Sequence, residues 1–111
     1  MAWKPLNNLN KRITFLDSQT YETDAGSQIQ KESAILTVWS AIKSVKAEEI
    51  KSTIGSIAKR HIVFLVRSDN PDLKQVQNYM KVKYQEDVYE IDFILWSDPQ
   101  SGYYSEIWCS L

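Results

Sequence analysis

Residues that carry chemistry are scarce in this chain. Its 111 residues include one cysteine, Cys109, one histidine, His61, and three glycines. A single cysteine forbids an internal disulfide and fits a reducing compartment. Three scattered glycines exclude a glycine-rich phosphate loop, and one cysteine with one histidine excludes the usual zinc ligand sets. We therefore expect no catalytic residues, no cofactor and no metal site, and the chain is not expected to be an enzyme.

Charge and hydropathy exclude two further classes of protein. The chain contains thirteen Lys and Arg and fourteen Asp and Glu, for a formal net charge of −1. Non-specific binding of duplex DNA needs a basic surplus or a basic patch. No apolar run approaches the ~20 residues of a membrane helix. The first ten residues lack the charged and apolar pattern of a signal peptide. The sequence thus predicts a soluble single domain made in a cytoplasm.

The last third of the chain has the pattern of an antiparallel meander. Three segments rich in aromatic and β-branched residues, 79–84, 88–96 and 103–111, are separated by the turn formers of 85–87 and 97–102. Because side chains alternate along a strand, the middle segment should direct one set inward and the other outward. The inward set is expected to be Tyr89, Ile91, Phe93 and Leu95.

Three more strands are expected upstream: at residues 11–16, along the run 35–42 within the segment 33–45, and at residues 60–68. In the first, Ile13 and Phe15 should face inward, and in the last Ile62, Phe64 and Val66. The central segment is apolar on both faces, and we expect Trp39 to anchor the core. The fold class that follows is mainly β: a small curved antiparallel sheet that closes into a five- or six-stranded β-barrel.

The connecting segments complete the expected organisation. Residues 1–10 read as a flexible N-terminal arm, and residues 11–111 as a single β-barrel domain. The polar stretch 17–31, with Asp24-Ala25-Gly26-Ser27 at its centre, predicts a long hairpin loop. In residues 46–59 the apolar period changes to that of one short amphipathic helix.

Two catalytic arrangements and one nucleic-acid surface are conceivable from the residues alone. Cys109 and His61 would form a nucleophile–base pair only if they were in contact, but a thiol on an apolar strand is usually inert. A carboxylate pair could arise among Glu90, Asp92 and Glu106, although a solvated face is the simpler interpretation. Lys81 and Lys83, with Tyr103 and Tyr104, could form a stacking surface for single-stranded nucleic acid. That surface defines the alternative function, a small β-barrel that binds single strands.

The order of the motifs resembles the bacteriophage head–tail joining proteins, also called head-completion or stopper proteins. The matching segments begin with Lys11-Arg12-Ile13-Thr14-Phe15 and the turn Asp24-Ala25-Gly26, and continue with Thr37-Val38-Trp39-Ser40-Ala41-Ile42, which is similar to the family's Val-Trp-Ala pattern. They end with Arg60-His61-Ile62-Val63, Met80-Lys81-Val82-Lys83-Tyr84, Tyr89-Glu90-Ile91 and Glu106-Ile107-Trp108-Cys109. One departure is Gln85-Glu86-Asp87, where a Gly-Arg turn is usual.

The resemblance implies a fold, a place and a set of partners. A member of this family is a small β-barrel that forms a ring at the neck of the virion, after assembly in the host cytoplasm. The ring closes the DNA-filled capsid and provides the interface for the tail, so the partners are the portal or adaptor proteins and the tail-completion protein. DNA passes through the channel without specific binding, and no membrane is involved. The loops 17–31 and 46–59 correspond to the family's contact segments.

Overall fold

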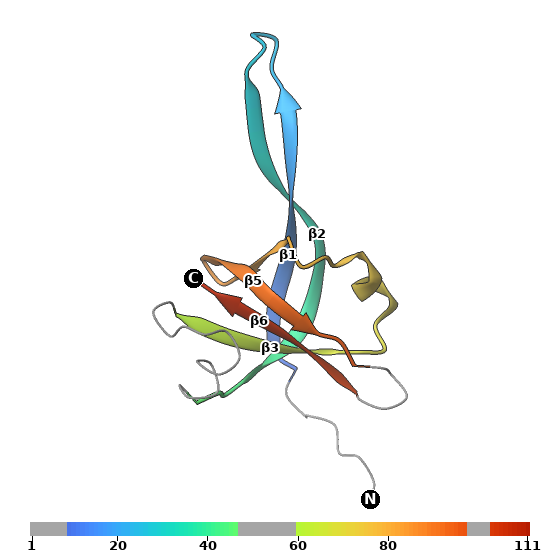
Figure 1. The fold of residues 1–111 in the computed structure, drawn as a ribbon. Helices are drawn as coiled ribbons and strands as arrows, with labels where there is room; N and C mark the ends of the chain where they lie inside the picture. The colour runs from blue at the N-terminus through green and yellow to red at the C-terminus, as the bar shows by residue number, and fades with distance from the viewer. Residues whose placement is uncertain (1–8, 47–59, 98–102) are drawn as a thin grey trace, which may run out of the picture.

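The computed structural model describes residues 9–46, 60–97 and 103–111. They form six strands and one short 3₁₀ helix (Figure 1). The elements are β1 (Lys11–Glu22), β2 (Gln28–Lys43), β3 (His61–Arg67), η1 (Pro71–Gln75), β4 (Lys81–Tyr84), β5 (Asp87–Leu95) and β6 (Tyr104–Ser110).

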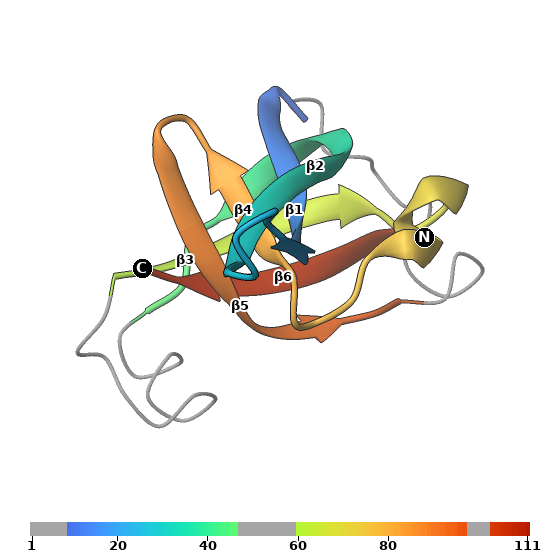
Figure 2. The same cartoon turned by 90° about the horizontal axis from the view of Figure 1, so that it is seen from above.

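All six strands belong to one antiparallel sheet whose hydrogen bonding closes on itself. The strand order is β1-β2-β3-β6-β5-β4, and β4 returns to β1 through residues 13–16 of β1 and 81–84 of β4. Seen from above in Figure 2, the strands wrap around a central space. The expectation of a mainly β, six-stranded antiparallel sheet is therefore confirmed.

The interior of the ring is filled by the alternating apolar side chains of every strand. Phe64 lies at its centre, fully buried, with its ring edge-on to Tyr84 and Tyr89 at centroid distances of 5.3 and 6.2 Å. The expected inward sets of β1 and β3 are confirmed because their alternation is regular. The core cluster consists of Ile13, Phe15, Val38, Phe64, Val66, Leu73, Val76, Val82, Tyr89, Ile107 and Cys109.

The expected inward face of β5 is only half right. Tyr89 and Ile91 pack with the core, but the pairing with β6 shifts between Ile91 and Phe93. Such a bulge inserts one residue and reverses the faces beyond it. Ile94 therefore packs against the core, and Phe93 lies outside, stacked on Trp108 at 5.1 Å.

Trp39 does not anchor the core. It retains 54% of its surface exposed, because the neighbouring residues Val38 and Ser40 take the inward positions of β2 and period two turns Trp39 outward. Because the residues around Trp39 are apolar on both faces of the strand, the sequence did not show which face points inward. Phe15 and Phe64, both fully buried, hold the place expected for Trp39.

The expected loop at residues 17–31 is largely a two-stranded hairpin. β1 continues to Glu22 and β2 begins at Gln28, so the turn contains only residues 23–27. The hairpin extends from the closed part of the sheet, at the top of Figure 1, and the molecule measures 62 Å along its longest axis.

Two short connections have a defined backbone geometry. Asn70 caps η1 by accepting a hydrogen bond from the backbone of Asp72, and Pro71 occupies the first turn, where its missing N–H costs nothing. β4 and β5 are joined by Gln85 and Glu86, with Gln85 at a φ of 56°. The helix expected at 46–59 falls, apart from Lys46, outside the described residues, as does the arm apart from residues 9 and 10.

Candidate protein-interaction surfaces

The hairpin formed by residues 17–33 is largely exposed, as far as its side chains are described. β4 pairs with β1 only at residues 13–16, and β3 pairs with β2 only at residues 41–43, so within the described chain the hairpin strands pair only with each other. A register shift between Phe15 and Leu16 marks the point where the ribbon leaves the body. A two-stranded ribbon gains little stability by itself, so this one presents surface without contributing to a core.

The tip of the hairpin has a defined geometry. The backbone N–H of Thr23 donates to the carbonyl of Ser27, and that of Gly26 donates to the carbonyl of Thr23, both at 2.8 Å. Gly26 has a φ of 80° with open space around it, so its backbone angle, rather than crowding, is what favours glycine. The tip is therefore an ordered turn rather than a loose end.

One ion pair supports the root of the hairpin. Lys81 Nζ of β4 lies 3.0 Å from Glu32 Oε1 of β2. This hydrogen bond to Glu32 raises the pKa of Lys81 above its ordinary value. An exposed pair of this kind stabilises weakly, and here it joins the ribbon to the closed sheet.

A groove opens where β2 and β3 separate. Beyond the pair Ala41–Leu65 the two strands are no longer paired, and the space beside them has a volume of about 490 Å³. Its outer wall is Trp39, whose ring lies 5.2 Å from the guanidinium carbon of Arg12. We call this the seam groove; it is lined by Leu9, Asn10, Val38, Trp39, Val66, Arg67, Asp69 and Asn70.

A second groove lies on the other side of the η1 connection. Trp96 forms one wall with about half of its surface exposed, and η1 with Val76 and Gln77 forms the other. Asp69 and Asn70 line both grooves. Arg67 holds Asp69 in place between the two grooves, since Arg67 Nε and Nη2 donate hydrogen bonds to the two carboxylate oxygens of Asp69 at 3.1 and 2.9 Å.

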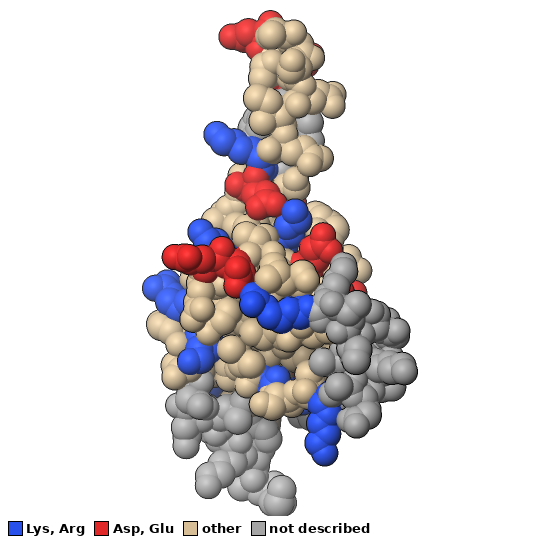
Figure 3. Space-filling model, turned by 90° about the vertical axis from the view of Figure 1, so that its left-hand side faces the viewer, with Lys and Arg blue, Asp and Glu red and all other residues tan. Residues whose placement is uncertain are grey.

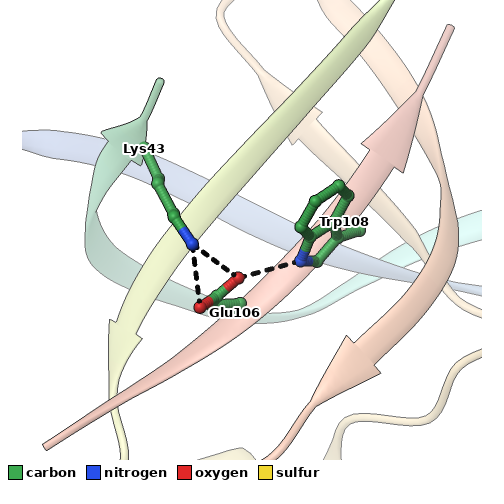
Figure 4. A network of polar contacts seen from close by, with 3 residues as sticks. All are labelled: Lys43, Glu106 and Trp108. Carbon is green, nitrogen blue, oxygen red and sulfur yellow. Dashed lines mark hydrogen bonds and ion pairs between the residues drawn. The ribbon is translucent and has the colours of Figure 1, made fainter. Parts of the chain in front are cut away.

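The outer face of β2, β3 and β6 carries a polar network over a buried tryptophan (Figure 4). Lys43 Nζ contacts both carboxylate oxygens of Glu106 at 3.2 and 3.3 Å, and the indole N–H of Trp108 donates to Glu106 at 3.0 Å. Trp108 and Val63 are nearly inaccessible to solvent on this outer side. The outer side of the sheet is therefore closely packed at this point.

The structure does not assemble the cysteine–histidine pair. Cys109 belongs to the inner core cluster, whereas His61 pairs with Ser110, the next residue of β6, whose side chain points to the opposite face. Burial, and then the negative charge of Asp92, raise the pKa of the Cys109 thiol far above its ordinary value. The thiolate that a nucleophile requires is thus strongly disfavoured.

Glu106 lies apart from the other two carboxylates, Glu90 and Asp92, which both lie beside Ser110. Asp92 accepts a hydrogen bond from Ser110 at 2.9 Å, and Glu106 is held by Lys43 and Trp108. Glu90 pairs in register with Ser110, four residues along β6 from Glu106, which corresponds to ~13 Å of strand. Within the described residues no group of three or more His, Cys, Asp or Glu could hold a metal ion.

The proposed nucleic-acid surface is not brought together either. Lys81 lies beside Glu90, and Tyr104 lies beside Arg67, at opposite ends of strands that are separated by β5. Lys81 is also engaged by Glu32. Figure 3 shows Lys and Arg interspersed with Asp and Glu on the face in view, without the basic stripe that tracks a phosphate backbone.

Sequence reasoning placed a hairpin loop at residues 17–31 but missed the pairing of its strands, and it missed the seam groove altogether. The seam groove depends on the residue at which β2 and β3 stop pairing. The pattern of residues along the two strands does not predict where that pairing ends. The hairpin had one usable signal: Asp24-Ala25-Gly26 is flanked by strand-forming Thr20, Tyr21 and Ile29.

These features define a class: a small closed β protein with an ordered projecting hairpin and exposed tryptophans beside grooves, which are the attributes of a subunit that binds other proteins. No helix long and apolar enough to cross a membrane occurs in the described parts of the chain. The model of the phage head completion protein family matches residues 5–111, and the chain belongs to that family. It is a structural protein of the bacteriophage head-completion type.

Solved structures share the fold. Protein SF1141 from Shigella flexneri 2a, known from its solution structure, superposes with a TM-score of 0.70 at 17% identity over 96% of each chain. A chain from the virion of a native gene transfer agent particle superposes with a TM-score of 0.55 at 15% identity over 91% of this chain and 92% of that one. None of the curated proteins compared with this sequence matches it significantly.

Proposed function

We propose that this protein is a subunit of the head–tail connector, which forms a ring at the neck of the virion, closes the DNA-filled capsid and offers the tail its attachment surface. Family membership supports a role in the virion. The observation that carries the finer proposal is the hairpin. It extends away from a closed sheet whose strands already pair with one another through backbone hydrogen bonds. Such a ribbon is suited to reach a neighbouring protein in an assembly.

The proposal includes a non-enzymatic mode of action. The candidate nucleophile is buried, with the pKa of its thiol raised far above its ordinary value, and Asp92 and Glu106 accept hydrogen bonds from neighbouring side chains. The partners that we propose are the portal or adaptor below, the tail-completion protein above, and further copies of this chain. DNA would pass through the ring without specific binding, which agrees with the mixed charges of Figure 3.

Complementation of particle assembly tests this function. Phage genomes that lack this reading frame should produce filled heads that leak DNA and carry no tails, and the full chain supplied in trans should restore both DNA retention and tails. Electron microscopy counts tailed particles, and nuclease protection measures retained DNA. If particles lacking the protein retain their DNA and carry tails at the normal frequency, the proposed role is wrong.

A variant without the hairpin sharpens the test. Residues 18–32 are replaced by Asn-Gly, a dipeptide that closes a two-residue hairpin between Asp17 and Ser33. We expect this folded variant to fail in complementation, whereas Lys83→Ala, at an exposed position of β4, serves as the matched control and should complement fully. Normal tail joining by the variant would show that the hairpin is dispensable for the proposed contacts.

A further inference from the structure

The hairpin and the rest of the described chain carry opposite net charge. Residues 17–33 contain four acidic residues, Asp17, Glu22, Asp24 and Glu32, and one basic residue, Lys31, so their formal charge is −3. The remaining described residues contain nine Lys and Arg against seven Asp and Glu, for a formal charge of +2. Such an asymmetry favours the approach of one copy's hairpin to the body of another copy.

The hairpin also offers an apolar group that the described residues only half bury. Ile29, near the tip on β2, keeps 50% of its surface exposed, and its backbone partner is Tyr21 on the facing strand. The other described side chains between Thr23 and Glu32 are polar or small. An isolated apolar group on an acidic ribbon is suited to insert into a small apolar recess with a basic border.

The seam groove has that composition. Leu9, Val38 and Val66 supply apolar walls, and Trp39 stands at the side with Arg12 against its ring. Among the described residues the contact recorded for Arg12 is the ring of Trp39 rather than a carboxylate, so its charge is suited to attract an acidic segment. Tryptophan and arginine are the residue types that most often dominate the energy of protein interfaces.

The groove beside η1 is the weaker candidate for the same ligand. It shares Asp69 with the seam groove, and its wall is η1, whose first turn contains Asp72. Lys74 lines this groove as well, but no cation is recorded against its tryptophan wall, Trp96, in the described structure, whereas Arg12 lies against Trp39 in the seam groove.

We propose that Ile29 and the flanking acidic hairpin of one copy dock into the seam groove of a second copy, between Arg12 and Arg67. This inference rests on the proposed function and names the contact between neighbouring subunits. The contact is heterologous, since each copy donates a hairpin and accepts another one. A heterologous contact links copies in series, and the series closes into a ring when the rotation between copies allows it.

Photo-crosslinking between isotopically distinct copies tests the contact directly. Benzoylphenylalanine replaces Ile29 in the full-length chain, and the labelled (¹⁵N) and unlabelled proteins are mixed at millimolar concentration before irradiation. Mass spectrometry should find cross-linked peptides of mixed isotope content that join position 29 to residues 36–40 or 65–70. The same photoreactive residue in place of Lys83 is the control and should give no such product.

The cross-linking experiment has clear adverse outcomes. Mixed-isotope products that map outside the seam groove refute the docking geometry, and a complete lack of them at millimolar concentration refutes self-association through this contact. In assembled particles, a product that joins position 29 to a different virion protein assigns the hairpin to that partner and overturns the proposal.

Sedimentation velocity measures how much the hairpin and the seam groove each contribute to the affinity between copies. Ile29→Ser and Arg12→Glu should each weaken concentration-dependent association by roughly tenfold or more, as loss of a central interface residue does, and Lys83→Glu should leave it unchanged. Added salt should weaken association in the parent. If both variants associate like the parent, the contact is wrong, while the complementation test above still judges the proposed function independently.

Discussion

Replacement of Phe64 by alanine should remove a large part of the domain's free energy of unfolding. Phe64 is fully buried on β3, and its ring meets Tyr84 and Tyr89 edge-on. Truncation of a buried phenylalanine to alanine costs about 3–5 kcal/mol, against a total stability of about 5–15 kcal/mol for a domain. For a domain of this size the melting temperature should fall by about 12–20 °C.

The matched comparison is Trp39→Ala, which removes a larger ring from an exposed position. Trp39 is 54% exposed, and its one recorded aromatic contact is the cation–π interaction with Arg12, worth about 0.5–1 kcal/mol at such a site. The melting temperature should therefore fall by only a few degrees. Thermal unfolding followed by circular dichroism measures both variants, and a larger loss for Trp39→Ala than for Phe64→Ala would refute this assignment of the core.

Three further results are expected. Replacement of residues 18–32 by Asn-Gly should change the melting temperature by only a few degrees, because the ribbon packs on no core and its pair Lys81–Glu32 is exposed; a collapse in calorimetry would show that the ribbon stabilises the body. The pKa of Cys109 is higher in the folded chain than in the unfolded one, so its contribution to stability is complete below about pH 8.5 and declines as pH rises above that value. Urea titrations at several pH values should show a smaller alkaline loss for Cys109→Val than for the parent, and equal losses would contradict the pKa. His61→Leu should leave the free energy of unfolding unchanged or raise it, because the imidazole is 4% exposed, neither ring nitrogen has a hydrogen-bond partner among the described residues, and Asp92 Oδ2 lies 3.8 Å from Nδ1, beyond hydrogen-bond distance. A loss above about 2 kcal/mol would show that the contact with Asp92 is essential.

Strand alternation gave most of the fold. The inward positions Ile13, Phe15, Ile62, Phe64 and Val66 follow from period two, and each packs in or against the core cluster. A thiol surrounded by apolar strand residues indicated that Cys109 is inert, and the structure places it inside the ring. These predictions succeed because a strand with one buried face has apolar residues at every second position, and this alternation shows which face is buried.

Other features depend on geometry that a pattern of residues does not encode. The bulge beside Asp92 reverses the direction of Phe93, and only the pairing with β6 shows it. Trp39 lies in a run that is apolar on both sides, so composition could not tell which side faces the core. The hairpin is built mainly from polar residues, and polarity alone predicts a loop. The candidate contact surfaces are therefore less predictable than the core, since they are not buried within one copy.

The closed sheet itself explains why association should use the hairpin and the seam. Once β4 pairs with β1, the body offers few unpaired strand edges, and closure is how small β proteins avoid uncontrolled edge-to-edge aggregation. Unpaired edges remain among the described strands along the hairpin and where β2 separates from β3. Stability and contact are thus assigned to different residues: Phe15 and Phe64 hold the fold, while Ile29, Trp39 and Arg12 lie outside the core. Substitutions in the second group should consequently alter assembly without unfolding the subunit.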